Sequence, residues 1–434
     1  MKNAQTPNLS PDMIEKILSA VDGQFQQQIE TTQKLIEFPS QRGHEQSAQD
    51  YVYQLLDQRG YSMDRWLIDI DSIRDHPGFS PVSINYDQAF NIVATHRPRE
   101  QKGRSLILNG HIDVVPTGPE EMWSTPPYEA KVEGDWLYGR GSGDMKAGLI
   151  ANIAALDALR SIGYQPAATV FVQSVTEEEC TGNGSLSCLV QGYTAEAALI
   201  PEPAGEDLVR ANVGVIWFKV RVKGLPVHVL DAGAGANAIE AMFPIITALH
   251  KLEDQWNAKK SDYPYFADTK KPMNISVGKI KGGDWASSVP AWCEIDVRAS
   301  IYPGTPPQEA AAEIEACVKQ ACLDNPFLSK NPAEIDYNGF FCEGYILEEG
   351  SEAERTLAYA HKETMGRSLN SKVLPGYLDA RVFSLYGDCK ALVYGPVTRN
   401  IHGFDECVSL SSVQRVTGTI ALFIAQWCGL ETID

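Results

Sequence analysis

The stretch from Leu106 to Lys146 constrains this chain more than any other segment. It opens with the apolar run Leu106-Ile107-Leu108, which predicts a buried strand because consecutive branched side chains leave no solvent face. The run ends at His111-Ile112-Asp113, where residues two apart share one face, and a glycine-rich turn carrying Asp144 follows. Since open α/β sheets bind ligands at the carboxyl ends of their strands, these imidazole and carboxylate groups are candidates for a metal site.

Three other predicted strands also end in side chains that can bind a metal. The strand over 168–175 precedes Glu177-Glu178-Glu179, the strand over 197–200 precedes Glu202, and the strand over 391–394 precedes His402. A single His-x-Asp is more often a surface turn, and an isolated acidic triplet is more often a solvated loop. Four such strand ends favour convergence, because strands that alternate with helices form a mostly parallel sheet whose carboxyl ends share one edge.

Between these segments the hydrophobic pattern changes. From Cys293 to Ile301 apolar and polar residues alternate, which predicts a sheet covered on one side only, and helices are predicted over 236–256 and 307–322. A chain of 434 residues is also longer than one hydrophobic core usually supports. We therefore predict an α/β fold in two domains. Residues 1–211 and 342–434 would form a catalytic domain, a mostly parallel sheet flanked by helices, and residues 212–341 an inserted α+β lid or dimerisation domain.

The composition argues against several classes of partner. With 37 basic and 56 acidic residues, the net charge of −19 disfavours nucleic acid and anionic membranes as partners. No run approaches the roughly 18 apolar residues of a membrane span, and the first residues lack the apolar core of a signal peptide. Nine scattered cysteines without a C-x-x-C pair fit a reducing compartment, so a cytoplasmic enzyme is expected.

The motifs at His111, Asp144, residues 177–184, Glu202 and His402 occur together in one order. In that order and spacing they resemble the metallohydrolase family that includes acetylornithine deacetylase, succinyl-diaminopimelate desuccinylase, aminoacylase and carboxypeptidase G. The similarity covers nearly the whole chain. It is nearest to the deacetylase and desuccinylase types that carry the variant Glu-Glu-Glu-Cys-Thr-Gly-Asn-Gly found here.

The resemblance implies a dinuclear metal site. Two zinc ions would be bridged by Asp144, through a cis peptide to Met145, and cobalt or manganese could replace zinc at such nitrogen and oxygen ligands. Asp113 would orient His111, and Glu178 would be the general base. The other ligands implied are His111 and Glu202 for one metal, and Glu179 and His402 for the other.

The assignment within the acidic triplet depends on the alignment. Matching Cys180 through Gly184 to the family's glycine-containing run places the base at Glu178 and the ligand at Glu179, whereas a shift by one residue would give Glu177 and Glu178. In either register, two metals about 3.5–4 Å apart would lower the pKa of a bridging water and clamp the amide oxygen. The adjacent acid would then move the proton.

The inserted domain is expected to contribute further residues and to form a homodimer. The resemblance implies that His228 reaches across the dimer toward the developing oxyanion and that Arg298 binds the substrate's α-carboxylate. Asn274 lies where relatives contact substrate. From the residues alone, His228 is an exposed turn histidine, and Arg298 could instead pair with Asp296 or Glu294.

Departures from the family pattern fall near the expected acyl group or amine side chain. Tyr377-Leu378-Asp379 replaces Gly-Thr-Asp, Gly395-Pro396-Val397 replaces Gly-Pro-Gly, and Ser287 stands where the family has asparagine, while Arg381 is expected to be structural. These departures leave the identity of the substrate undecided, whereas the type of reaction is unaffected.

We therefore expect a zinc-dependent hydrolase of a small N-acyl amino acid, similar to acetylornithine deacetylase or succinyl-diaminopimelate desuccinylase. A deformylase of pyrimidine salvage and a dipeptidase or carboxypeptidase are alternatives with the same chemistry. A non-catalytic metabolite-binding protein would have lost ligands or the base, and every one is present.

Overall fold

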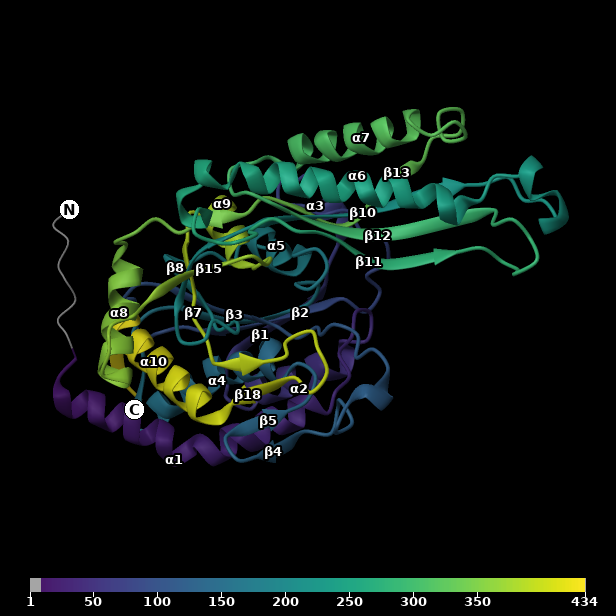
Figure 1. The fold of residues 1–434 in the computed structure, drawn as a ribbon. Coiled ribbons are helices and arrows are strands. Elements are labelled where there is room, and N and C mark those ends of the chain that lie inside the picture. Colours follow the sequence, from purple (N-terminus) through teal and green to yellow (C-terminus); the bar gives the residue numbers. More distant parts are fainter. Residues whose placement is uncertain (1–8, 434) are drawn as a thin grey trace.

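The computed structural model describes residues 9–433, and a six-stranded sheet lies at its centre (Figure 1). Its strand order is β1-β2-β7-β3-β8-β16. Strands β7, β3, β8 and β16 run parallel, while β1 and β2 add an antiparallel edge. The predicted mostly parallel sheet is therefore confirmed. The strands are β1 (Ser62–Leu67), β2 (Phe90–His96), β3 (Leu106–His111), β7 (Val170–Val175), β8 (Ala197–Ile200) and β16 (Lys390–Val393).

Helices cover this sheet and close its core. The first begins where Ser10 accepts a hydrogen bond from the Met13 N–H and Pro11 occupies the first turn, as a capping hydroxyl followed by proline predicts. Helix α4 is almost entirely buried, because α1 and α10 pack against it. The helices of this part are α1 (Pro11–Ile36), α2 (Gln46–Asp57), α3 (Ile70–Ile73), α4 (Ala147–Ser161), α5 (Asn183–Val190), α8 (Glu352–Met365), α9 (Ala380–Tyr386) and α10 (Leu410–Cys428).

A second, antiparallel sheet has the order β11-β12-β10-β13 and carries α6 and α7 on one face (Figure 1). The alternating residues from Cys293 to Ile301 place their apolar side chains in a core shared with both helices. Ser300 on the opposite face is also buried, and its hydroxyl accepts a hydrogen bond from Arg298. These elements are β10 (Gly214–Lys223), α6 (Ala238–Ala258), β11 (Ile275–Gly282), β12 (Trp292–Ile301), α7 (Pro307–Leu323) and β13 (Glu334–Cys342). The domain limits at residues 211 and 341 stay a prediction.

Three small sheets join segments that are distant in the sequence. They have the orders β14-β9-β15, β17-β18-β5-β4 and β19-β6. No helix among residues 9–433 is long and apolar enough to cross a membrane. The strands are β4 (Lys131–Glu133), β5 (Trp136–Tyr138), β6 (Tyr164–Pro166), β9 (Leu208–Asn212), β14 (Tyr345–Ile346), β15 (Ser371–Leu374), β17 (Thr398–Arg399), β18 (Cys407–Ser409) and β19 (Leu430–Thr432).

Candidate active site

The carboxyl ends of three adjacent parallel strands deliver acids and a histidine to one place. Strand β3 lies between β7 and β8, so the residues that end these strands become neighbours. Two further groups arrive from elsewhere, one from the turn before α4 and one from the loop between β17 and β18. The side chains brought together are His111, Asp144, Glu178, Glu179, Glu202 and His402.

Asp144 lies between the two histidines. Its Oδ1 is 3.1 Å from His111 Nε2, and its Oδ2 is 3.4 Å from His402 Nε2. On one side Glu202 Oε1 lies 3.8 Å from His111 Nε2, and on the other Glu179 Oε2 lies 3.2 Å from His402 Nε2. A carboxylate that turns one oxygen to each of two ligand groups has the geometry of a bridging ligand. The peptide between Asp144 and Met145 is cis.

The donor set fits two divalent cations. Glu179 Oε1 and Glu202 Oε1 are buried and have no hydrogen-bond partner among the described residues. Burial raises the pKa of Glu202 to about 8, and the charge of Glu179 raises the pKa of His402 to about 11. Such crowding of buried acids is costly unless cations neutralise it. Imidazole and carboxylate ligands suit zinc and its neighbours in the first transition row.

Within the acidic triplet, Glu177 is turned away from this cluster. Arg42 donates to both of its oxygens, from Nε at 2.5 Å and from Nη2 at 2.7 Å, and the Tyr86 hydroxyl donates at 2.7 Å. By contrast, Glu178 Oε2 lies 4.0 Å from His111 Nε2. Burial raises the pKa of Glu178 well above its usual range. The geometry therefore supports the predicted register, in which Glu179 is a metal ligand and Glu178 is the neighbouring acid that binds no metal.

Asp113 contacts His111 differently from the arrangement expected. His111 Nδ1 lies 2.8 Å from the main-chain oxygen of Asp113 and 3.7 Å from its carboxylate. The carboxylate accepts the N–H of Glu179 at 3.1 Å instead, and burial raises its pKa to about 7. The Asp113 main chain orients the imidazole, while its side chain holds the loop that carries the acids.

A cavity of about 470 Å³ opens beside the cluster. Arg298 lines it and bonds to Ser300 Oγ at 2.9 Å. No ion pair joins Arg298 to a carboxylate within residues 9–433, because Glu294 pairs with Lys219 and Arg221. Burial lowers the pKa of Arg298. The rest of the wall is mainly apolar: Val115, Pro203, Ala204, Val209, Trp217, Phe340, Leu374, Pro375, Gly376, Tyr377, Leu378, Val393 and Ile401.

His228 and Asn274 neither line this cavity nor belong to the cluster of candidate metal ligands. His228 is exposed, and its Nδ1 accepts the N–H of Leu230 at 3.2 Å. Asn274 is half-buried; its main-chain oxygen accepts the N–H of Ser300 at 2.8 Å, and its N–H donates to Ser300 Oγ at 3.3 Å. Within one chain, the structure therefore leaves both outside the cluster.

Glu406 is a supporting residue that the sequence did not single out for this role. It accepts the main-chain N–H groups of Gly143 at 2.9 Å and Asp144 at 3.0 Å, and it pairs with Arg140 Nη1 at 2.6 Å. These bonds fix the glycine-rich turn against the loop that carries His402. Its place four residues after that histidine was the available signal in the sequence.

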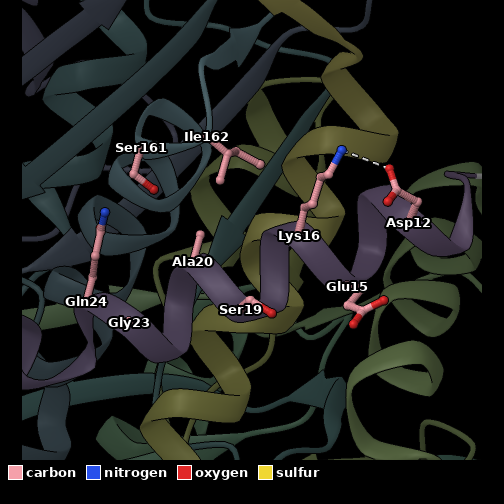
Figure 2. A pocket seen from close by; sticks show the side chains of 9 residues that line it. All are labelled: Asp12, Glu15, Lys16, Ser19, Ala20, Gly23, Gln24, Ser161 and Ile162. Atoms are coloured by element: carbon pink, nitrogen blue, oxygen red, sulfur yellow. Dashed lines mark ion pairs between the residues drawn. The ribbon is translucent and has the colours of Figure 1, made fainter.

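A groove of about 650 Å³ along α1 is not a candidate metal site (Figure 2). Its charged groups include Lys16 and Asp12, which pair at 2.9 Å and are exposed. Ser161 and Ile162 lie across from the helix. The groove contains no histidine, so it lacks the donor set found at the strand ends.

Comparisons with known proteins give relatives that match most of the chain. A deformylase of N-formyl-4-amino-5-aminomethyl-2-methylpyrimidine from Halalkalibacterium halodurans is 27% identical over 96% of this chain and 98% of its own. A succinyl-diaminopimelate desuccinylase from Dechloromonas aromatica is 24% identical over 80% of this chain and 89% of its own.

Solved structures share the fold. The dipeptidase Dug1p from Saccharomyces cerevisiae has a TM-score of 0.79 at 15% identity and covers 96% of this chain and 98% of its own. Human carnosine dipeptidase 1 has a TM-score of 0.76 at 14% identity, covering 96% and 99%. The profile of peptidase family M20/M25/M40 matches residues 107–426. The resemblance inferred from the motifs is thereby confirmed, and the chain belongs to peptidase family M20/M25/M40.

Proposed function

We propose that this protein is a metal-dependent amide hydrolase that removes an acyl group from a small N-acyl amino acid. One observation carries the proposal: the cavity that holds the candidate metal ligands also contains Arg298, a guanidinium with no carboxylate partner among the described residues. A planar guanidinium suits a bidentate substrate carboxylate. The amide to be cleaved would then lie between Arg298 and the cluster.

The groups around the cavity have separate roles in hydrolysis. Two divalent cations held by the cluster would activate a water molecule and polarise the amide oxygen. Glu178 faces the same cavity and lies outside the proposed ligand set, so its carboxylate can accept the water's proton and then donate it to the leaving amine. Arg298 holds the substrate by its carboxylate, and the apolar wall excludes other water.

The first experiment is Glu178→Gln on zinc-loaded protein. Loss of the general base should lower kcat by about 10²–10⁴-fold. Bound metal, measured by mass spectrometry, should stay at the wild-type content, because Glu178 is not among the proposed ligands. Glu179→Gln is the matched control and should lose metal. Loss of metal from the Glu178 variant as well would show that the roles are misassigned.

A second experiment tests the role of Arg298. Arg298→Met should raise KM for N-acyl amino acids by roughly 10–100-fold, the effect of losing about 1.5–3 kcal/mol from a charge-assisted contact. The same variant should change little for an N-acyl amine that lacks the carboxylate. An equal loss on both substrates would exclude Arg298 as the carboxylate site.

A specific feature of the cavity favours a second candidate, a deformylase of an aminopyrimidine. Its wall contains Trp217, Phe340 and Tyr377, with ring centroids 5.2 Å apart for Trp217 and Phe340 and 4.3 Å apart for Phe340 and Tyr377. Aromatic faces suit a flat heterocycle. Release of formate, acetate, succinate and free amino acid from a small substrate panel separates the two candidates and also tests a dipeptidase or carboxypeptidase activity.

We also propose that the enzyme is a homodimer in which His228 reaches the substrate bound by the partner subunit, and that Asn274 contacts substrate. The support is the exposure of the loop around His228, where Leu230 is 86% exposed and the nearby Trp285 is 74% exposed. Zinc is the proposed metal, with cobalt or manganese as substitutes. The absence of disulfides among the nine cysteines, all of which lie in the described residues, supports a cytoplasmic location.

A further inference from the structure

Arg381, at the start of α9, is a fully buried cation without a carboxylate partner. Its exposed fraction is 0%, and its Nη2 donates to the main-chain oxygen of Gly78 at 2.8 Å. Among residues 9–433 its Nε and Nη1 atoms have no hydrogen-bond partner, and no carboxylate forms an ion pair with it; the charge of Asp379 acts on it without such a contact. A buried guanidinium in this state is costly. It has spare capacity to bind an anion, because two of its nitrogens are free to donate.

Tyr377 separates this guanidinium from the substrate cavity. The Tyr377 ring lines the cavity, whereas Arg381 does not. The guanidinium carbon of Arg381 lies 5.6 Å from the centroid of that ring. The ring is held from two sides: it packs on Phe340 at a centroid distance of 4.3 Å, and its hydroxyl donates to Asp379 Oδ1 at 2.9 Å. Tyr377 therefore acts as a fixed wall between the cavity and Arg381.

The wall determines which charges the cavity offers to a substrate. Apart from the histidine and acids of the cluster, Arg298 is the only charged side chain among residues 9–433 that lines the cavity. A substrate with one carboxylate can pair with Arg298. A second carboxylate on the acyl group would meet the Tyr377 ring and the acids of the cluster, and it would lose its hydration without gaining a cation.

We propose that Tyr377 is a specificity-determining residue that separates Arg381 from the cavity and so restricts the enzyme to acyl groups that carry no carboxylate. This inference rests on the proposed amide hydrolysis at the same site. It names the substrate class: N-acyl compounds whose acyl part carries no carboxylate. Removal of the ring exposes Arg381 to the cavity and creates a second anion subsite.

The experiment compares succinate and butyrate as ligands of the zinc-loaded full-length protein by isothermal titration. The two probes have the same chain length and one carboxylate in common, so direct binding to metal affects both. Tyr377→Ala should increase the affinity for succinate relative to butyrate by at least tenfold over wild type. Tyr377→Phe, which removes the hydroxyl but keeps the ring, is the matched control and should keep the wild-type ratio.

A double variant identifies the cation responsible. Adding Arg381→Met to Tyr377→Ala should abolish the gain in the succinate ratio. If the gain persists in the double variant, or if Tyr377→Ala binds the two probes in the wild-type ratio, the proposal is overturned. Tyr377→Leu keeps apolar packing on Phe340 and gives the same comparison if the alanine variant does not fold.

Hydrolysis assays separate this proposal from the proposed function. On acetyl and succinyl derivatives of one amino acid, wild type should prefer acetyl, and Tyr377→Ala should shift the kcat/KM ratio at least tenfold toward succinyl. If wild type cleaves no member of the panel, the proposed function fails while the binding ratios still decide the role of Tyr377. A wild-type preference for succinyl would contradict the role of Tyr377 directly.

Discussion

Glu45, in the turn before α2, shows how strongly burial changes the pKa of a single residue near this site. Its Oε1 accepts the N–H of Gly43 at 2.9 Å, but its Oε2 is buried without a partner. Burial, with a further contribution from the charge of Asp113, raises the pKa of Glu45 to about 8. The folded protein therefore holds a proton on Glu45 that the unfolded chain, with a pKa near 4.5, releases earlier.

This proton predicts a pH dependence of stability. Because the folded-state pKa is the higher one, the stabilisation is complete below about pH 4.5 and is lost as the pH rises to about 8. In that window Glu45 should lower the free energy of unfolding by at most ~1.4 kcal/mol per pH unit. Glu45→Gln should reduce this slope in urea denaturation at pH 5, 7 and 9.

Glu37→Gln serves as the control for that measurement, because Glu37 is exposed and should leave the slope unchanged. The same slope in wild type and in the Glu45 variant would show that Glu45 is not protonated in the folded protein at neutral pH.

At the scale of elements, the segment from Ser40 to Arg42 joins two strand ends. Ser40 accepts the N–H of Val114 at 2.9 Å and donates from Oγ to the Ile112 oxygen at 2.6 Å, beside the end of β3. Arg42 holds Glu177 beyond the end of β7. The segment thereby sets the distance between the loop of His111 and the loop of the acidic triplet.

Removal of the Arg42 guanidinium should loosen this connection. Arg42→Met leaves the buried Glu177 carboxylate without its counter-charge, which costs about 3–5 kcal/mol of stability, while the Tyr86 hydroxyl still donates to it. It should also lower metal affinity and kcat by about 10–100-fold, the usual effect of losing a support behind a ligand. Bound zinc, kcat and the unfolding midpoint are the quantities to measure.

Arg59→Met is the matched control, because Arg59 also forms a part-buried ion pair, with Asp157 at 2.5 Å. It should lose stability but keep the metal content and kcat. Equal effects of the two substitutions on activity would mean that the Arg42 contact is only structural.

On the scale of elements, patterns in the sequence predicted the strands that carry the site. The strands β3, β7, β8 and β16 each contain a short apolar run, and each is followed by its polar groups, so both the strands and their shared edge could be inferred. The strands β14 and β17 could not, because each has two residues and no pattern of its own.

For the whole molecule, the metal cluster should be a source of stability. The acids and histidines come from loops far apart in the chain, so bound cations would connect those loops and neutralise their charges. Binding contributes ~2.7 kcal/mol for a site at 100 times its Kd. Dialysis against a chelator should therefore lower Tm by several degrees.

Addition of zinc should restore the midpoint, whereas magnesium, which prefers oxygen ligands and octahedral geometry, should not. Calorimetry with and without chelator makes the measurement. A midpoint that does not respond to metal removal would contradict a dinuclear centre held by these residues.

The sequence by itself determined the parallel sheet, the strand ends that carry His111 and Glu202, and the family. These follow from local patterns and from spacing along the chain. Only the tertiary structure turned Glu177 toward Arg42 and Glu178 toward His111, left Arg298 without a carboxylate partner among the described residues, and placed Tyr377 against Arg381. Each of these outcomes depends on groups that no local pattern connects: Arg42, which turns Glu177 aside, is 135 residues away from it.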